Sequence, residues 1–92
     1  PQQLEGLKQL DMVFFDGNHT EEATLRYFNK CLPLVHNDTL FVFDDIHWSK
    51  GMQTAWEKIT TNSRVRISID LYRLGLVFFR EGIVPQHFVL RY

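Results

Sequence analysis

The sequence lacks the features that mark several large classes of protein. It has one cysteine, Cys31, among 92 residues, so it can form no internal disulfide and no cysteine-based zinc site. Its net charge is −1 without a long run of either sign, which argues against a nucleic-acid surface. No apolar run approaches the roughly 20 residues that a membrane-spanning helix needs. We therefore expect a cytoplasmic protein that binds neither nucleic acid nor membranes.

The chain does contain enough apolar side chain to build a core. Hydrophobic residues make up 45% of the sequence and aromatic residues 14%, which excludes a disordered chain. A length of 92 residues allows one small domain at most. Because Pro1 is not a native translation start, we expect that the chain is processed, trimmed or cut from something longer.

The apolar pattern predicts strands that alternate with helices. Residues 11–16 and 39–43 are continuous apolar runs, as in strands of a parallel sheet covered on both faces. A helix is predicted after the first run, with Asn18 as its N-cap and Glu21 completing a capping box. A second helix is predicted after Ser49, with an apolar stripe that consists of Met52, Ala55, Trp56 and Ile59.

The last third of the chain predicts a hairpin. Residues 65–71 alternate between apolar and polar, and residues 74–79 follow after a link that is too short for a parallel crossover. Residues 87–92 are expected to form one more extended segment. The predicted fold class is therefore α/β, a Rossmann-like doubly wound sheet of three parallel strands and two helices, with an antiparallel hairpin at its edge.

Carboxylates end both of the continuous apolar strands. Asp16 ends the first, and Asp44 and Asp45 end the second. Because ligands of open α/β sheets bind beyond the carboxyl ends of the strands, we expect these three side chains at one rim. Grouped oxygen ligands suit Mg²⁺ better than a soft metal. His19 and His47 follow the two carboxylate positions within three residues.

Each of these residues also has a plainer interpretation. Aspartates at strand ends often cap helices or form turns, and His19 and His47 are of a kind common in loops. Tryptophans such as Trp48 and Trp56 usually pack in a core. Cys31 lies on an apolar helix stripe, so we expect it in the core as well. The stronger signal is the register, because both carboxylate groups stand at the ends of successive apolar strands.

Three segments together resemble a known family. They are DMVFFDGNHTEEATLRYF, TLFVFDDIHWSKGMQTAWEKI and SIDLYRLGLVFF, which cover residues from about 10 to 80. They resemble the C-terminal half of class I S-adenosylmethionine-dependent methyltransferases, most closely the small-molecule O-methyltransferase-like branch. The resemblance implies that these strands are the fourth to seventh of a seven-stranded sheet, with the last antiparallel to the rest.

The resemblance also implies a chemistry. Cation-dependent members of the family hold Mg²⁺ with residues that match Asp16, Asp44 and Asp45. The implied reaction is methyl transfer from a sulfonium to an oxygen of a small-molecule substrate. A metal would orient a substrate hydroxyl and lower its pKa, and His47, His19 or Lys50 would take the proton.

One part of the family pattern is missing. The family binds its cofactor mainly through a glycine-rich turn, and the five glycines of this chain show no G-x-G spacing. Asp16 and Gly17 are the cofactor contacts that the resemblance leaves. We therefore expect residues 1–92 to be one partial domain that needs an N-terminal half to bind S-adenosylmethionine, is inactive alone and forms a homodimer.

Two alternatives remain open from the residues. One is a non-catalytic α/β interaction module in which the Asp44–Asp45 pair merely caps the helix of Trp48. The other is a metal-dependent hydrolase or hydroxylase-like relative that reuses the same carboxylate edge.

Overall fold

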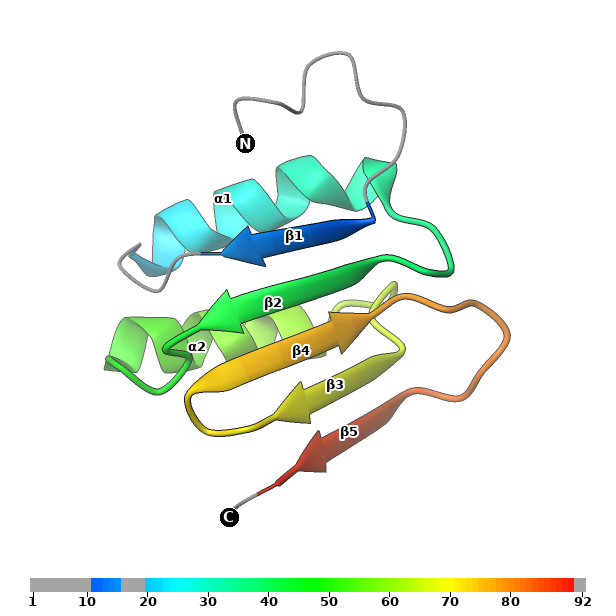
Figure 1. Ribbon diagram of the computed structural model, residues 1–92. Coiled ribbons are helices and arrows are strands. Elements are labelled where there is room, and N and C mark those ends of the chain that lie inside the picture. The colour runs from blue at the N-terminus through cyan, green and yellow to red at the C-terminus, as the bar shows by residue number, and fades with distance from the viewer. Residues whose placement is uncertain (1–10, 16–19, 91–92) are drawn as a thin grey trace.

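The computed structural model describes residues 11–15 and 20–90, which form an open five-stranded sheet and two α-helices (Figure 1). No helix in these ranges is long and apolar enough to cross a membrane. The elements in chain order are β1 (Met12–Phe15), α1 (Glu21–Cys31), the 3₁₀ helix η2 (Leu32–Leu34), β2 (Leu40–Asp44), α2 (Lys50–Thr60), β3 (Ile67–Asp70), β4 (Leu74–Phe78) and β5 (Gln86–Val89).

The strand order is β1-β2-β4-β3-β5, which confirms the predicted α/β class. β1 and β2 are parallel, and β4 is antiparallel to both β2 and β3, so β1, β2 and β3 run in one direction. The β3–β4 pair is the predicted antiparallel hairpin. It differs from the prediction in its place, because β4 hydrogen-bonds on both sides and β5 covers β3 as the edge strand.

Helix α1 begins two residues later than the sequence predicts. Its N-cap is Thr20, whose side-chain oxygen accepts the Ala23 N–H at 3.2 Å. The predicted cap, Asn18, is therefore wrong, and Asn18 itself lies outside the described residues. The helix ends at Cys31 because Pro33 follows within η2, and proline has no N–H to continue the helix.

Helix α2 follows the prediction closely. The Ser49 side chain accepts the Met52 N–H at 3.1 Å and caps the helix. The four residues of the predicted stripe are all buried. Since Ser49 is the cap, the Asp44–Asp45 pair does not cap this helix, and that part of the interaction-module alternative is wrong.

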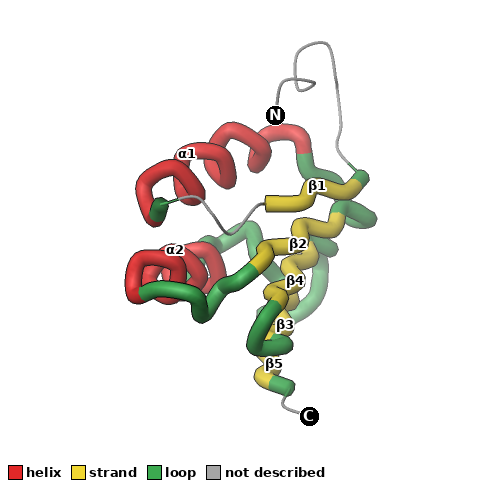
Figure 2. The backbone as a smooth tube through the Cα atoms, turned by 60° about the vertical axis from the view of Figure 1, so that its left-hand side comes forward, coloured by secondary structure: helices red, strands yellow, loops and turns green. Residues whose placement is uncertain are grey.

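The core lies between the sheet and the two helices, which pack on the same face (Figure 2). Phe15 of β1 stacks on Phe43 of β2 with ring centroids 4.3 Å apart. Phe43 in turn meets Trp56 of α2 edge-on at 5.8 Å. Aromatic rings contribute most of this burial, so they fix how the helices sit on the sheet.

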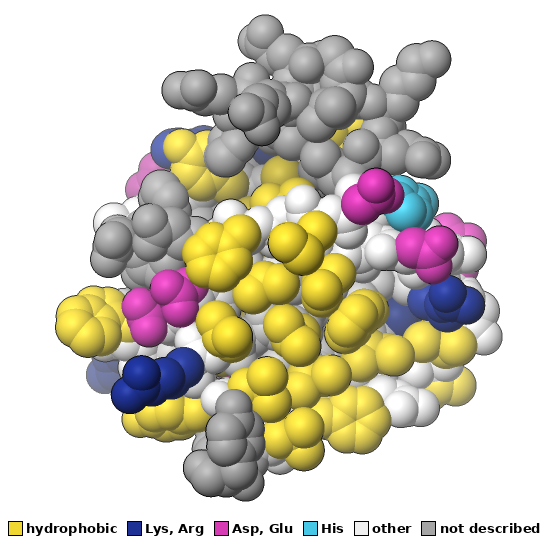
Figure 3. Space-filling view, in the orientation of Figure 1, with side chains coloured by type: hydrophobic (Ala, Val, Ile, Leu, Met, Phe, Trp, Pro, Cys, Tyr) yellow, Lys and Arg dark blue, Asp and Glu magenta, His cyan; other side chains and the backbone are white. Residues whose placement is uncertain are grey.

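The other face of the sheet is apolar and carries no helix among the described residues (Figures 1 and 3). Pairing across the strands sets two apolar rows on it. We call these rows the open face; its members are Met12, Leu40, Phe78 and Ile67, then Phe14, Val42, Leu76, Ile69 and Phe88. Met12 and Phe14 are 64% and 56% exposed, so this face has apolar surface that a partner could bury.

Candidate active site

A pocket of about 330 Å³ lies at the carboxyl edge of the parallel strands. Asp45, His47 and Trp48 line it from the loop after β2, and Tyr72 and Arg73 line it from the turn after β3. This is the edge at which ligands bind in open α/β sheets. The pocket therefore lies where the carboxylate pattern of the sequence predicted a site.

The chemical centre of the pocket is a histidine held by a carboxylate. His47 Nε2 lies 2.8 Å from Asp70 Oδ2, and Asp70 is buried at the end of β3. The other oxygen of Asp70 accepts the Tyr72 N–H at 2.8 Å. A carboxylate only accepts hydrogen bonds, so in the neutral imidazole Nε2 carries the hydrogen and Nδ1 keeps the lone pair.

This geometry suits a general base. Within the described residues, His47 Nδ1 makes no hydrogen bond. The bond to Asp70 fixes the ring and would stabilise the imidazolium that forms when Nδ1 takes a proton. The arrangement can therefore accept a proton from a hydroxyl or thiol placed in the pocket.

The backbone of the two loops is joined beside this pair. The Asp45 N–H donates to the Arg73 carbonyl at 2.7 Å, and the Tyr72 ring stacks on the His47 ring at 5.1 Å and 16°. Asp45 and Tyr72 are also the non-glycine residues with positive φ among those described, at 55° and 72°. Backbone strain of this kind gathers at functional sites, where the surrounding structure holds it in place.

The predicted site residues differ in where they lie relative to the pocket. Asp44 ends β2 half-buried, and Asp45 and His47 line the pocket. Lys50 is exposed at the start of α2 and is not among the lining residues. Asp16, Gly17 and His19 lie outside the described residues, so their predicted roles are untested.

The predicted metal site is likewise untested as a whole. Among residues 11–15 and 20–90, no group of three His, Cys, Asp or Glu side chains could hold a metal ion. The predicted set of Asp16, Asp44 and Asp45 includes a residue beyond those ranges. The described residues thus offer an adjacent pair of carboxylates rather than a complete ligand set.

Asp70 is the residue of the candidate site that the sequence analysis missed. It ends the third strand of the parallel set, as Asp44 ends the second. The same rule, that a carboxylate at the end of an apolar strand marks the ligand-binding edge, applies to Asp70. It was not applied because residues 65–71 alternate between apolar and polar, so Asp70 looked like one of several polar positions.

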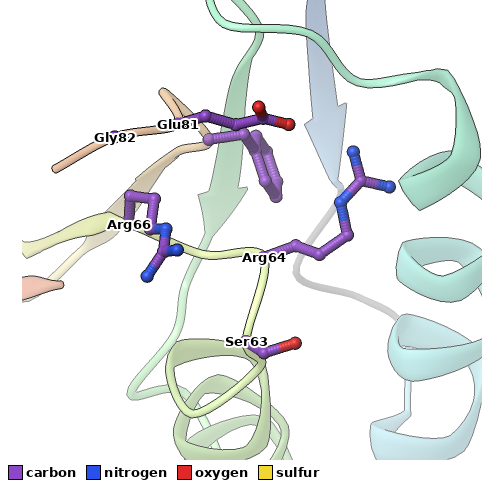
Figure 4. A pocket seen from close by; sticks show the side chains of 6 residues that line it. Ser63, Arg64, Arg66, Glu81 and Gly82 are labelled. Atoms are coloured by element: carbon purple, nitrogen blue, oxygen red, sulfur yellow. The ribbon is translucent and has the colours of Figure 1, made fainter. Parts of the chain in front are cut away.

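A second pocket, of about 290 Å³, lies at the opposite edge, before β3 and after β4 (Figure 4). Its lining residues are Ser63, Arg64, Arg66, Phe79, Glu81 and Gly82. The side chains of Arg64 and Arg66 point away from one another in Figure 4, and Arg64 donates to the Leu32 carbonyl at 2.8 Å. Because these charged groups do not converge, this pocket is a weaker candidate than the one at His47.

Comparison with known proteins identifies the class. The family model described as a methyltransferase domain matches residues 1–46, half of the chain. The chain therefore belongs to the methyltransferase domain family. No curated protein and no solved structure gives a significant match. The match includes β1, α1, β2 and the Asp44–Asp45 pair, and it ends just before His47.

Proposed function

We propose that this chain forms the acceptor side of an S-adenosylmethionine-dependent methyltransferase that methylates an oxygen of a small molecule. The observation that carries the proposal is the His47–Asp70 pair in a pocket at the carboxyl edge of the sheet. Membership of the methyltransferase domain family supports it, and S-adenosylmethionine is the cofactor that the family implies. The proposed location is the cytoplasm, which a chain with one free, buried cysteine suits.

The cofactor supplies a methyl group on a sulfonium sulfur. The residues described here do not form a cradle for it, since the chain has five glycines without the close spacing of a glycine-rich turn. We therefore assign these residues to the acceptor alone. The apolar open face fits this assignment, because it offers a surface on which the rest of a larger domain can pack.

In the proposed reaction this chain positions the acceptor and removes its proton. The acceptor hydroxyl would hydrogen-bond to His47 Nδ1 and pass its proton to that nitrogen. The cofactor would supply the methyl carbon to the acceptor oxygen, its sulfur–carbon bond would break, and it would leave as a neutral thioether. Asp70 then faces the ring across a 2.8 Å hydrogen bond, which holds the imidazole in its orientation. Among the proposed bases, His47 is preferred to Lys50 because Lys50 does not line the pocket.

The test is methyl transfer from labelled S-adenosylmethionine by the full-length enzyme. His47→Gln should lower kcat by about 10²- to 10⁴-fold, the usual contribution of a general base. Lys50→Gln serves as the control, and its rate should stay within about twofold, as for an exposed charge outside the pocket. Full activity in folded His47→Gln would contradict the proposed base.

Asp70→Asn tests the positioning role separately. It should lower kcat more than it raises KM, because Asp70 acts through His47 and does not line the pocket. Nitrogen chemical shifts of His47 should also report a change in which ring nitrogen carries the hydrogen. An unchanged tautomer together with an unchanged rate would remove Asp70 from the mechanism.

Divalent-metal assistance is a finer part of the proposal. It is supported by Asp44 and Asp45, adjacent at the carboxyl edge, with Asp16 as the third ligand from the sequence. Calorimetry with Mg²⁺ on the full-length enzyme tests it, with Asp44→Asn and Asp45→Asn as matched variants. Full methyl-transfer rates in both variants would show that the pair is not a metal site.

A second candidate function, a non-catalytic interaction module, is favoured by the open face alone. That face is apolar and partly exposed, as an interaction surface would be. His47→Gln distinguishes the two functions. It should impair a methyltransferase but not a binding module, whose function should be lost on substitution of residues on the open face.

A further inference from the structure

The pocket at the carboxyl edge is lined largely by planar rings. His47, Trp48 and Tyr72 supply three of its five lining residues, and Asp45 and Arg73 supply one charge of each sign. Its volume, about 330 Å³, is at the small end of ligand pockets, so it suits a molecule of one or two rings.

The two tryptophans of the chain differ in burial in a way that points to a ligand. Trp56 packs in the core at 8% exposure, whereas Trp48 is 76% exposed beside the pocket. A tryptophan indole left in water forgoes the large hydrophobic gain that its burial would give. Stacking of a flat ligand on Trp48 would recover part of that gain.

The second ring of the pocket is held in a fixed plane. Tyr72 stacks on His47 at a centroid distance of 5.1 Å and an angle of 16°, and its N–H is bound to buried Asp70. The bond from the Asp45 N–H to the Arg73 carbonyl joins the two loops. Rings that are held before binding lose little entropy when a ligand stacks on them, which favours aromatic ligands.

Arg73 supplies an available positive charge at the same pocket. Within the described residues its guanidinium makes no ion pair or side-chain hydrogen bond, whereas Arg80 pairs with Asp38 at 3.0 Å and Arg64 donates to the Leu32 carbonyl. A guanidinium presents a flat fork of donors that matches a carboxylate or phosphate. A ligand with an acidic substituent would therefore gain a charge-assisted pair here.

We propose that this pocket binds an aromatic hydroxy acid, with its ring on Trp48 and Tyr72, its acidic group at Arg73 and its hydroxyl at His47. The assignment of the hydroxyl rests on the proposed function, whereas the ring and acid contacts rest on the pocket alone. Asp45, on the same wall, accepts a hydrogen bond from a further hydroxyl of the ligand.

Three probes separate the parts of this proposal in the full-length protein. They are 4-hydroxybenzoate, the neutral 4-hydroxybenzyl alcohol and the non-aromatic 4-hydroxycyclohexanecarboxylate. Binding is followed by the indole N–H resonance of Trp48, with Trp56 as the internal reference. The aromatic acid should bind about three- to tenfold more tightly than either analogue, as one stacking contact or one exposed charge pair provides.

Variants then assign each preference to a residue. Trp48→Leu should abolish the preference for the aromatic ring, and because Trp48 is 76% exposed the change removes no core contact; binding is followed here by ligand-detected resonances. Arg73→Gln should abolish the preference for the acid. Arg80→Gln, which changes another exposed arginine beyond the other end of β4, is the matched control and should leave both preferences intact.

Equal affinity for all three probes, or no binding of any, would overturn this inference. The proposed function is judged by a different readout, transfer of labelled methyl from S-adenosylmethionine. If the protein binds the aromatic acid selectively but has no methyl-transfer activity, the proposed function is wrong and the pocket assignment stands. Methyl transfer by a protein that shows no preference for the aromatic ring or the acid would contradict the pocket assignment and leave the proposed function standing.

Discussion

Tyr72 has a strained backbone, and its ring contacts His47, the proposed general base. Its φ of 72° lies in the left-handed region, where a side chain crowds its own carbonyl, and its ring stacks on His47. The strain is held by hydrogen bonds on both sides, from the Tyr72 N–H to Asp70 and from the Asp45 N–H to the Arg73 carbonyl. The site is thus shaped before any ligand enters.

Two substitutions that both remove the ring isolate the strain at this position. Tyr72→Gly should be more stable than Tyr72→Ala by about 1 kcal/mol, because glycine adopts positive φ without a Cβ clash. Urea unfolding of the two variants measures the difference. At neighbouring Leu71, which has no positive φ, the same pair should reverse, with alanine the more stable. The same order at both positions would contradict the strained turn.

Cys31 should make stability depend on alkaline pH. Burial raises the pKa of the Cys31 thiol above its ordinary value of 9.0. The folded state therefore keeps a proton that the unfolded state loses, and stability falls as pH rises from near 9 through the raised pKa. The extra slope approaches about 1.4 kcal/mol per pH unit relative to Cys31→Ala.

Unfolding free energies of both proteins between pH 7 and pH 10.5 provide the measurement. Absolute stabilities will differ, because alanine leaves a small void, so the slopes are compared. Below pH 8.5 the two slopes should coincide. Parallel curves across the whole range would show that the thiol does not titrate differently on folding.

Between elements, Gly75 sets how closely α2 approaches the sheet. A Cβ on Gly75 of β4 would lie 2.5 Å from two ring atoms of Trp56 in α2. Gly75→Ala should therefore cost about 1–3 kcal/mol of stability, the usual cost of overpacking. Gly51→Ala is the matched control. There the nearest atom is 3.6 Å away, and alanine should stabilise the helix by about 0.5–1 kcal/mol.

A double variant distinguishes this clash from a general effect on the strand. Trp56→Phe makes room at the ring, so the cost of Gly75→Ala should shrink in that background. Denaturant unfolding of the four proteins in the cycle gives the coupling energy. Strict additivity would mean that the ring and the glycine do not meet.

Local signals in the sequence predicted the elements well. Ser49 and the stripe of α2 were readable because capping and helical spacing depend on neighbours within one or two turns. The start of α1 was placed wrongly at Asn18, since Thr20 has the same capping chemistry two residues on. Element identity therefore followed from the sequence more securely than element boundaries did.

Contacts across the sheet were harder to predict than the elements themselves. The position of β4 between β2 and β3, and of β5 outside β3, depends on pairing between distant segments. The bond between His47 and Asp70 likewise joins residues 23 apart in the sequence. The carboxyl-edge rule drew attention to His47, which lines the pocket, but it could not show which carboxylate would reach it.

At the scale of the whole molecule, the helices on one face leave the other face open. Figure 3 shows apolar side chains gathered over the strands there. In the described residues, β1 also stands at one edge of the sheet, without a further strand beside it. An apolar face next to a free strand edge favours association, which is the structural basis for the expected homodimer.

We predict that the 92-residue chain associates with itself through the open face. Phe14 is 56% exposed on that face, so a charge at this position should oppose burial there. Phe14→Glu should weaken association by about tenfold or more, because burial of a phenylalanine contributes about 1.5–3 kcal/mol. Asn29 is an exposed residue of α1, which packs on the opposite face of the sheet. Asn29→Glu adds the same charge there and should leave association unchanged. Sedimentation equilibrium over a range of concentrations measures all three proteins. A wild-type chain that stays monomeric at high concentration, or equal effects of the two substitutions, would show that the open face does not bind a second copy.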